Sequence, residues 1–188
     1  MEQPSATAAP ERTNWRVIAT DADRARLRDW RSTFVDALEA ARRAGHAADI
    51  AREGRLLQPD AAIPGALPNG DYRCRVIKIG AKSEGLLNYI AYPAFRCRVA
   101  QSGLAQSFTK LTGSQRQVGI IYPVDQMRQV FLGTLVHGDE RGALLYGQDE
   151  ARDVAAFVER IEPGRWRMIM PQPYYESQLD VIELVPAA

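Results

Sequence analysis

The sequence predicts a mainly β fold: an antiparallel barrel of about eight or nine strands with an N-terminal helix packed against it. Two observations support this fold. From residue 71 to residue 186, short segments alternate apolar and polar side chains, as strands with one buried face do. Most of these segments end at a turn signal, and no connection is long enough for the crossover helix that parallel strands require. Closing such a sheet into a barrel would remove its exposed edges.

The N-terminal part is expected to be a tail followed by helices. Residues 1–19 are rich in Ala, Pro, Ser and Thr, which predicts a disordered tail. The helical segment, residues 20–54, begins at a capping box formed by Thr20 and Asp23, and Gly45 is a natural end for its main helix. One face of this helix is apolar, at spacings of three and four: Leu27, Trp30, Phe34, Leu38 and Ala41. We expect this face to pack on the same domain. A helix that binds a partner or a membrane surface is the alternative, although mixed charges disfavour an anionic membrane.

The linker and the strands follow. Residues 55–70 contain three prolines and two glycines, which predict an irregular linker. The barrel domain, residues 71–186, opens with a strand at 71–80, and residues 81–92 form a long excursion. The other predicted strands are 95–100, 107–113, 117–123, 129–138, 143–147, 154–161, 165–171 and 179–185.

Composition excludes several classes of protein. The chain has 188 residues and a formal net charge of +1, which argues against a general nucleic-acid-binding protein. No apolar run reaches the roughly 18 residues of a transmembrane helix, so we expect no membrane span. Two histidines and two cysteines without a CxxC motif are too few for a zinc site, and we expect neither a metal nor a cofactor.

The two cysteines have matching surroundings, YRCRV at Cys74 and FRCRV at Cys97. In each strand Cys shares a face with the aromatic residue and Val, while Arg lies on the other face. If the strands are close, the sulfurs meet, and we predict a disulfide; two buried free thiols are the alternative. Closing a loop of about 24 residues would contribute roughly 3 kcal/mol. A disulfide implies the periplasm or the cell exterior.

Four arginines on these two strands share the opposite face: Arg73, Arg75, Arg96 and Arg98. If the strands pair, their guanidinium groups form one patch that is able to bind phosphate or carboxylate. The alternative is an outer surface neutralised by Asp and Glu of neighbouring strands.

Candidate ligand-binding residues lie at a glycine turn and in the expected interior. The turn carries Lys110, Ser114, Gln115 and Arg116 at a barrel mouth, where they could bind an anionic or polar head group; an ordinary hairpin loop is the alternative. The expected interior either fills the core or lines one cavity. Its members are Phe95, Phe108, Ile120, Tyr122, Leu132, Leu144, Tyr146, Trp166, Met168 and Met170. Of these, Tyr122, Tyr146, Trp166 and Met168 are the ligand-binding candidates.

No catalytic residue is predicted. His46 and His137 stand beside no nucleophile, and the sequence has no GxSxG, HExxH, P-loop or Rossmann motif. Several acidic residues of the strands could pair as acid and base, but alternating charges are more typical of a solvated face. They are Asp153, Glu159, Asp180 and Glu183.

Several segments resemble a known bacterial family. They include DYRCRVIKIG, YPAFRCRV, FTKLTGSQR, RDVAAFVERI and RWRMIMPQP, and the likeness runs from about Thr20 to Pro186. The family is the exported domain of unknown function 4893, found mainly in alphaproteobacteria. The resemblance implies an envelope location and supports the disulfide, but it supplies no activity and no catalytic residues. The sequence begins without a signal peptide, so we expect the mature form of an exported protein.

Together these observations predict a barrel similar to the lipocalin-like class. By analogy of fold, we expect a non-enzymatic periplasmic protein that binds a small lipophilic or amphipathic molecule. That function requires a cavity of at least about 300 Å³, open at one end. A protein-protein interaction module, such as an inhibitor or an envelope-assembly factor with a filled barrel, is the first alternative. A hydrolase with an unrecognised site is the second.

Overall fold

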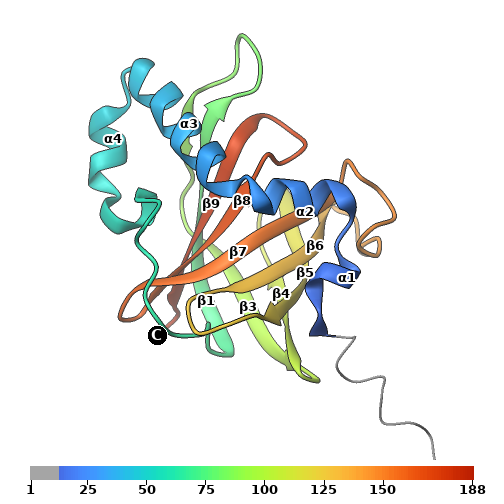
Figure 1. Ribbon diagram of the computed structural model, residues 1–188. Helices are drawn as coiled ribbons and strands as arrows, with labels where there is room; N and C mark the ends of the chain where they lie inside the picture. The colour runs from blue at the N-terminus through green and yellow to red at the C-terminus, as the bar shows by residue number, and fades with distance from the viewer. Residues whose placement is uncertain (1–12) are drawn as a thin grey trace, which may run out of the picture.

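The chain forms a closed antiparallel barrel of eight strands with one extra strand beside it (Figure 1). A computed structural model describes residues 13–188. The strands are β1 (Gly70–Ala81), β2 (Tyr89–Ala91), β3 (Phe95–Ser102), β4 (Ala105–Lys110), β5 (Gln115–Pro123), β6 (Gln129–His137), β7 (Asp153–Glu162), β8 (Arg165–Pro171) and β9 (Ser177–Pro186). From β3 to β9 each strand pairs with the next, and β9 returns to β1. The predicted barrel is therefore confirmed.

Strand β1 has two different neighbours on one edge. Its first residues, Gly70–Cys74, pair with β3, whereas Ile77–Ile79 pair with β2. The excursion at residues 81–92 therefore leaves the barrel and returns as the short strand β2. The expected strand at residues 143–147 does not form, because this segment lies in the loop between β6 and β7. Its Leu145 side chain is 72% exposed, so no sheet face buries its apolar pattern.

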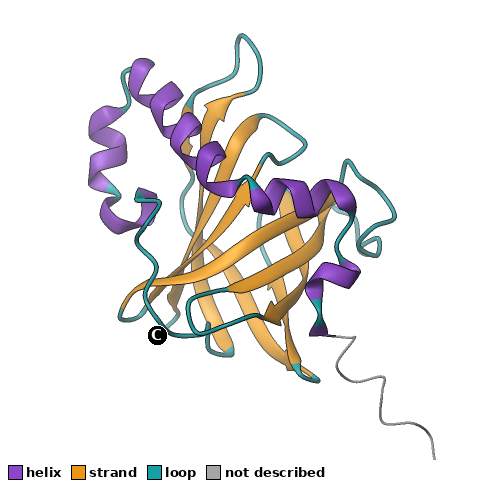
Figure 2. Ribbon diagram, in the orientation of Figure 1, coloured by secondary structure: helices purple, strands orange, loops and turns teal. Residues whose placement is uncertain are grey.

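Short helices precede the barrel (Figure 2). They are α1 (Trp15–Ile18), α2 (Asp21–Arg28), α3 (Trp30–Arg43), α4 (Ala47–Arg52) and the 3-10 helix η2 (Gly54–Leu57). The Thr20 hydroxyl accepts a hydrogen bond from the Asp23 backbone N–H at 3.2 Å, which confirms the predicted N-cap. Gly45 ends α3 with φ +96°, in the left-handed region where glycine is favoured. The expected single helix is interrupted at Asp29, which separates α2 from α3.

The helices cover two areas of the outer wall. The segment from α3 to η2 packs on β1, β8 and β9, with Phe34, Leu38 and Ile79 among the buried side chains. Helices α1 and α2 pack over β6 and β7 through Trp15 and Leu27. The expected disordered tail is therefore wrong for residues 15–18, which form α1; residues 1–12 lie outside the described part of the chain.

The barrel interior is filled along most of its length. Phe108, Phe131, Trp166 and Met168 interdigitate there with the disulfide. That bond joins Cys74 to Cys97, with their Cα atoms 6.0 Å apart, and confirms the predicted pairing over free thiols. The expected interior is confirmed for Phe108, Trp166, Met168 and Met170, and Phe95 packs against this core.

Five residues of the expected interior lie elsewhere. Ile120, Tyr122, Leu132 and Tyr146 belong to the cluster beneath α1 and α2, and Leu144 is exposed in the loop between β6 and β7. The reason is that helices cover the outer face of these strands. Both faces of β6 and β7 are then apolar, so alternation no longer tells inside from outside.

The linker after η2 is fastened to the barrel by a buried arginine. The Arg167 guanidinium donates hydrogen bonds to the carbonyls of Leu56, Gln58 and Pro59 at 2.9, 2.7 and 3.0 Å. It also forms an ion pair with Glu159 at 2.9 Å, and both side chains are completely buried. Because the linker has no regular structure of its own, this one side chain satisfies carbonyls that a helix or sheet would otherwise pair.

Candidate functional site

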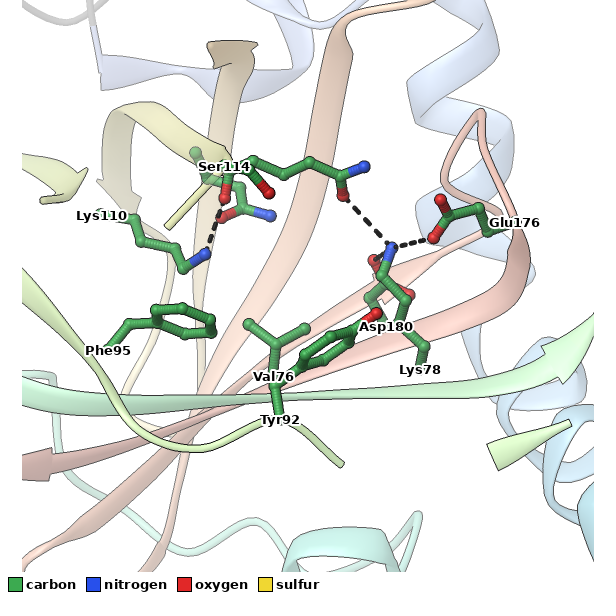
Figure 3. A pocket seen from close by; sticks show the side chains of 10 residues that line it. Val76, Lys78, Tyr92, Phe95, Lys110, Ser114, Glu176 and Asp180 are labelled. Atoms are coloured by element: carbon green, nitrogen blue, oxygen red, sulfur yellow. Dashed lines mark hydrogen bonds and ion pairs between the residues drawn. The ribbon is translucent and has the colours of Figure 1, made fainter. Parts of the chain in front are cut away.

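A polar pocket opens at one mouth of the barrel, where β1, β4 and β8 end and β5 and β9 begin (Figure 3). Its volume is about 200 Å³. Two lysines lie on opposite sides of it, Lys78 from β1 and Lys110 from β4. The other lining residues are Val76, Tyr92, Phe95, Ser114, Gln115, Gln117, Glu176 and Asp180. The filled core below makes this pocket a shallow polar cup rather than a hollow barrel.

Lys78 is held by carboxylates. Its Nζ lies 3.1 Å from Glu176 Oε2 and 3.5 Å from Asp180 Oδ2. Burial alone would lower the pKa of Lys78, but the Asp180 and Glu176 carboxylates outweigh it and raise that pKa. Complete burial raises the pKa of Asp180, which the nearby Lys78 ammonium and Ser177 hydroxyl only partly offset. The Ser177 hydroxyl donates to Asp180 and fixes that carboxyl group.

Within the described residues, no carboxylate forms an ion pair with Lys110. Its Nζ donates to the backbone carbonyl of Gln115 at 2.7 Å and lies 3.8 Å from the centre of the Phe95 ring. Burial lowers the pKa of Lys110 to about 8, and the positive charges of Lys78 and Arg116 add to this effect. The pocket therefore contains one cation that is neutralised by the protein and one that is not.

A second unsatisfied group lies in the same pocket. The side-chain carbonyl Oε1 of Gln117 is buried and has no hydrogen-bond partner within the described residues. Buried polar atoms without partners are rare in folded proteins because desolvation without a hydrogen bond is costly. Within the described residues, Gln117 is therefore a side chain of the pocket wall whose buried carbonyl oxygen the protein does not satisfy.

Exposed apolar side chains lie on three loops at this end of the barrel. We call them the apolar rim: Leu86, Leu87, Leu144, Leu145, Tyr174 and Tyr175. The loops after β1 and before β9 lie at the top of Figure 1, and the loop between β6 and β7 lies at its right. The Lys82 backbone N–H donates to the Glu176 carbonyl at 3.1 Å, which joins the loop after β1 to the loop before β9. The Tyr175 ring lies 6.2 Å from the ring of His137 at the end of β6.

The candidate ligand-binding residues separate into three groups. Lys110, Ser114 and Gln115 line the mouth pocket. Arg116 points away and donates to the backbone carbonyls of Gly113, Gly138 and Glu140, so it ties two loops together. The other four do not line the pocket: Tyr122 and Tyr146 lie on the outer wall, and Trp166 and Met168 lie in the core.

The arginine patch is only partly free. Arg75 pairs with Glu53 and Glu183, and Arg98 pairs with Asp71. Arg73 and Arg96 are exposed and lie directly opposite each other on β1 and β3. The four guanidinium groups therefore do not act as one anion site, because acidic neighbours neutralise half of them.

The acidic residues of the strands do not form a solvated face. Asp153, Glu159 and Asp180 are buried, and each has a polar partner in the protein. Glu183 is half-buried between Arg75 and Arg165. The expectation of a solvent-exposed charged face is wrong because helices and loops cover Asp153, Glu159 and Glu183 on the outer wall, whereas Asp180 lines the mouth pocket.

Among the polar residues of the pocket, sequence reasoning missed Lys78, Gln117, Glu176 and Asp180. A signal was present for two of them. Lys78 lies on the same face of β1 as Cys74 and Val76, which point into the barrel. It is directly opposite Asp180 in the barrel wall. A charged residue at an inward position of an otherwise apolar strand indicates a polar site within the barrel.

The family model described as "Domain of unknown function (DUF4893)" matches residues 15–184. This chain belongs to the DUF4893 family. The match covers the helices and the whole barrel, so the resemblance of the separate segments extends to one continuous domain. No curated protein and no solved structure gives a significant match. Within residues 13–188, no helix is both long and apolar enough to cross a membrane.

Proposed function

We propose that this DUF4893 protein is a non-enzymatic binding protein for an amphipathic molecule with an acidic head group. The head group enters the mouth pocket beside Lys110, and the apolar part lies against the apolar rim outside the barrel. The single observation that carries the proposal is the buried Lys110 amine, which faces the pocket without a carboxylate partner.

The dimensions of the pocket favour a head group over a whole lipophilic molecule. Its volume of about 200 Å³ is below the range of roughly 300–1,000 Å³ that is usual for drug-sized ligands. At about 30 Å³ for each water molecule, it accommodates a carboxylate or phosphate and a few neighbouring atoms. Because Phe108, Trp166 and their neighbours fill the barrel below, an alkyl chain must remain outside.

The apolar rim supplies a surface for that chain. Leu87 and Leu145 are 65% and 72% exposed, and they belong to two different loops around the mouth. Exposed apolar side chains gathered around a polar pocket are typical of a binding site rather than of an inert surface.

The proposed location is the periplasm or the cell exterior. The disulfide supports this location, because disulfides persist in oxidising compartments and are rare in the cytosol. Labelling of free thiols in protein taken directly from its host, denatured without reductant, tests the proposal. Modification of Cys74 and Cys97 under these conditions would contradict it.

Binding of dodecanoate, followed by calorimetry below its micellar concentration, tests the function. We expect dodecanoate to bind and dodecanol to bind about tenfold more weakly, since a charge-assisted hydrogen bond contributes roughly 1.5–3 kcal/mol. The K110M variant should lose the same preference. R73M, which removes an exposed arginine of the outer wall, is the matched control and should bind normally. Equal binding of the acid and the alcohol would contradict the proposal.

A protein-protein interaction module is the second candidate. The exposed apolar rim favours it, since a partner could cover the rim and insert an acidic side chain into the pocket. Native mass spectrometry of protein from the host envelope separates the two candidates. A retained mass of a few hundred daltons supports the amphipathic ligand, whereas a protein-sized adduct that the double variant L87S/L145S loses supports the module.

A further inference from the structure

The position of the Lys110 amine suits it to act as a nucleophile as well as to bind an acidic group. It lies in the pocket wall, and its only polar contact in the described chain is the Gln115 carbonyl. A carbonyl accepts one of its hydrogens but does not hold its charge as a carboxylate would. The face of the Phe95 ring, 3.8 Å away, replaces water on one side.

The second lysine of the pocket strengthens this effect. Lys78 is retained as a cation by Glu176 and Asp180, so it repels a proton on Lys110. A lysine that is desolvated and lies near another cation is a known route to an activated amine.

We infer that Lys110 is an imine-forming residue, whose amine condenses with the carbonyl carbon of a small 2-oxo acid held in the mouth pocket. The inference rests on the proposed function only in placing an acidic ligand in this pocket, and it does not need the apolar rim. The pocket of about 200 Å³ admits such an acid entirely.

The reaction balances without an oxidant or a reductant. The neutral amine of Lys110 attacks the carbonyl carbon, a C–N bond forms, and the oxygen takes up a proton to give a carbinolamine. A second proton, taken up from water at the open mouth of the pocket, allows that oxygen to leave as water while the nitrogen forms the C=N bond. One water molecule is released for each imine formed.

The chain suits a direct test because it has only three lysines: Lys78, Lys82 and Lys110. The protein is incubated with pyruvate and cyanoborohydride at pH 7.5, and the reduced adduct is located by peptide mapping. With a pKa of about 8, Lys110 is neutral roughly 200-fold more often than an ordinary lysine at this pH. We expect at least about tenfold faster labelling of Lys110 than of Lys82, a ratio that falls to about one in urea.

Lys82 is a stringent control, because burial also lowers its pKa but it lies outside the mouth pocket. Peptide mapping separates both lysines from the α-amino group, which is also reactive near neutral pH. The K110R variant retains a cation but should lose the adduct. Comparison of folded and unfolded wild-type protein keeps the test decisive if K110R does not fold.

Equal labelling of Lys110 and Lys82 in the folded protein would overturn the inference. If dodecanoate binds but pyruvate leaves no adduct on Lys110, imine formation is wrong and the proposed function stands. If the adduct forms on Lys110 while dodecanoate fails to bind, imine formation stands and the proposed function is wrong.

Discussion

Gly119 and Gly133 lie directly opposite each other on β5 and β6, and the Phe131 ring occupies the space that a side chain on either would need. A Cβ on Gly119 would also meet the backbone of Leu132 and Gly133. This pair of glycines lets Phe131 lie across the barrel and meet Phe108 edge to face, with ring centres 5.5 Å apart.

Substitution of either glycine should therefore overpack the core. We expect G119A or G133A to lower the free energy of unfolding by about 2 kcal/mol or more, because backbone and ring must both shift. Urea unfolding measures the change. G142A is the matched control, since a Cβ there meets nothing within 4 Å, and it should be neutral. An unchanged urea midpoint for G119A would show that the interior is more loosely packed than the contacts around Gly119 indicate.

The disulfide should contribute measurably to stability. Cys74 and Cys97 are separated by 23 residues, and a closed loop of this size restricts the unfolded chain by about 3 kcal/mol. The double variant C74A/C97A should lose about that amount in urea unfolding monitored by tryptophan fluorescence. Reduction of the wild-type protein should give a similar loss. If the variant retains full stability, restriction of the unfolded chain by the disulfide does not contribute to the free energy of unfolding.

The sequence predicts the barrel well where one face of a strand is exposed. On β1 and β3, arginines alternate with cysteines and aromatic residues, and the predicted inner face is the observed one. On β6 and β7 the helices bury the outer face, so apolar residues occupy both sides. The alternation of apolar and polar residues then no longer distinguishes the inner face from the outer face, so it wrongly predicts Leu132 of β6 in the interior.

The candidate site was only half predictable for a related reason. The glycine turn pointed to Lys110, Ser114 and Gln115, which do line the pocket. Asp180 was assigned to a solvated face because alternating charges usually lie there. Its role follows from the closure of the barrel, which sets Lys78 directly opposite it between the first and last strands. Strand order, which no local pattern contains, was needed to bring these two residues together.

Stability should rise with pH through the titration of Lys110. Its pKa is about 8 in the folded protein and 10.5 as an ordinary lysine, so the unfolded chain binds more protons between these values. Below pH 8 the cost of burying the cation is fully present, and it is relieved as pH rises toward 10.5. Each unit of difference corresponds to about 1.4 kcal/mol, and we expect a gain of about 2 kcal/mol after allowance for solvent screening.

Urea unfolding between pH 7.5 and 9.5 measures this gain. Above about pH 10 the tyrosines act in the opposite direction. Burial raises the pKa of Tyr72 and of Tyr89 to about 12, so the unfolded chain loses their protons first and stability falls. K110M is the control and should remove the rise between pH 8 and 9.5. A wild-type protein whose stability is flat over this range would contradict the low pKa.

Removal of the buried Arg167 should be more damaging than any surface change. The R167L variant leaves the buried Glu159 carboxylate to Arg128 alone and deprives the carbonyls of Leu56, Gln58 and Pro59 of their donor. Breaking a buried pair from one side costs about 3–5 kcal/mol. The exposed R73L is the matched control and should stay within about 0.5 kcal/mol of wild type, because Arg73 is exposed and lies opposite Arg96 on β3 and Val185 on β9.

A double-mutant cycle separates the two roles of Arg167. The variant R167L/E159L removes both charges, so it should recover the part of the loss that arises from the Glu159 carboxylate that only Arg128 then neutralises. The remaining loss belongs to the linker, and hydrogen exchange should show it as faster exchange of amides in residues 56–61. R167L/E159L could instead regain wild-type stability with unchanged amide hydrogen exchange in the linker. The hydrogen bonds from Arg167 to the carbonyls would then contribute little to stability, and apolar packing of Leu56 and Leu57 would hold the linker in place.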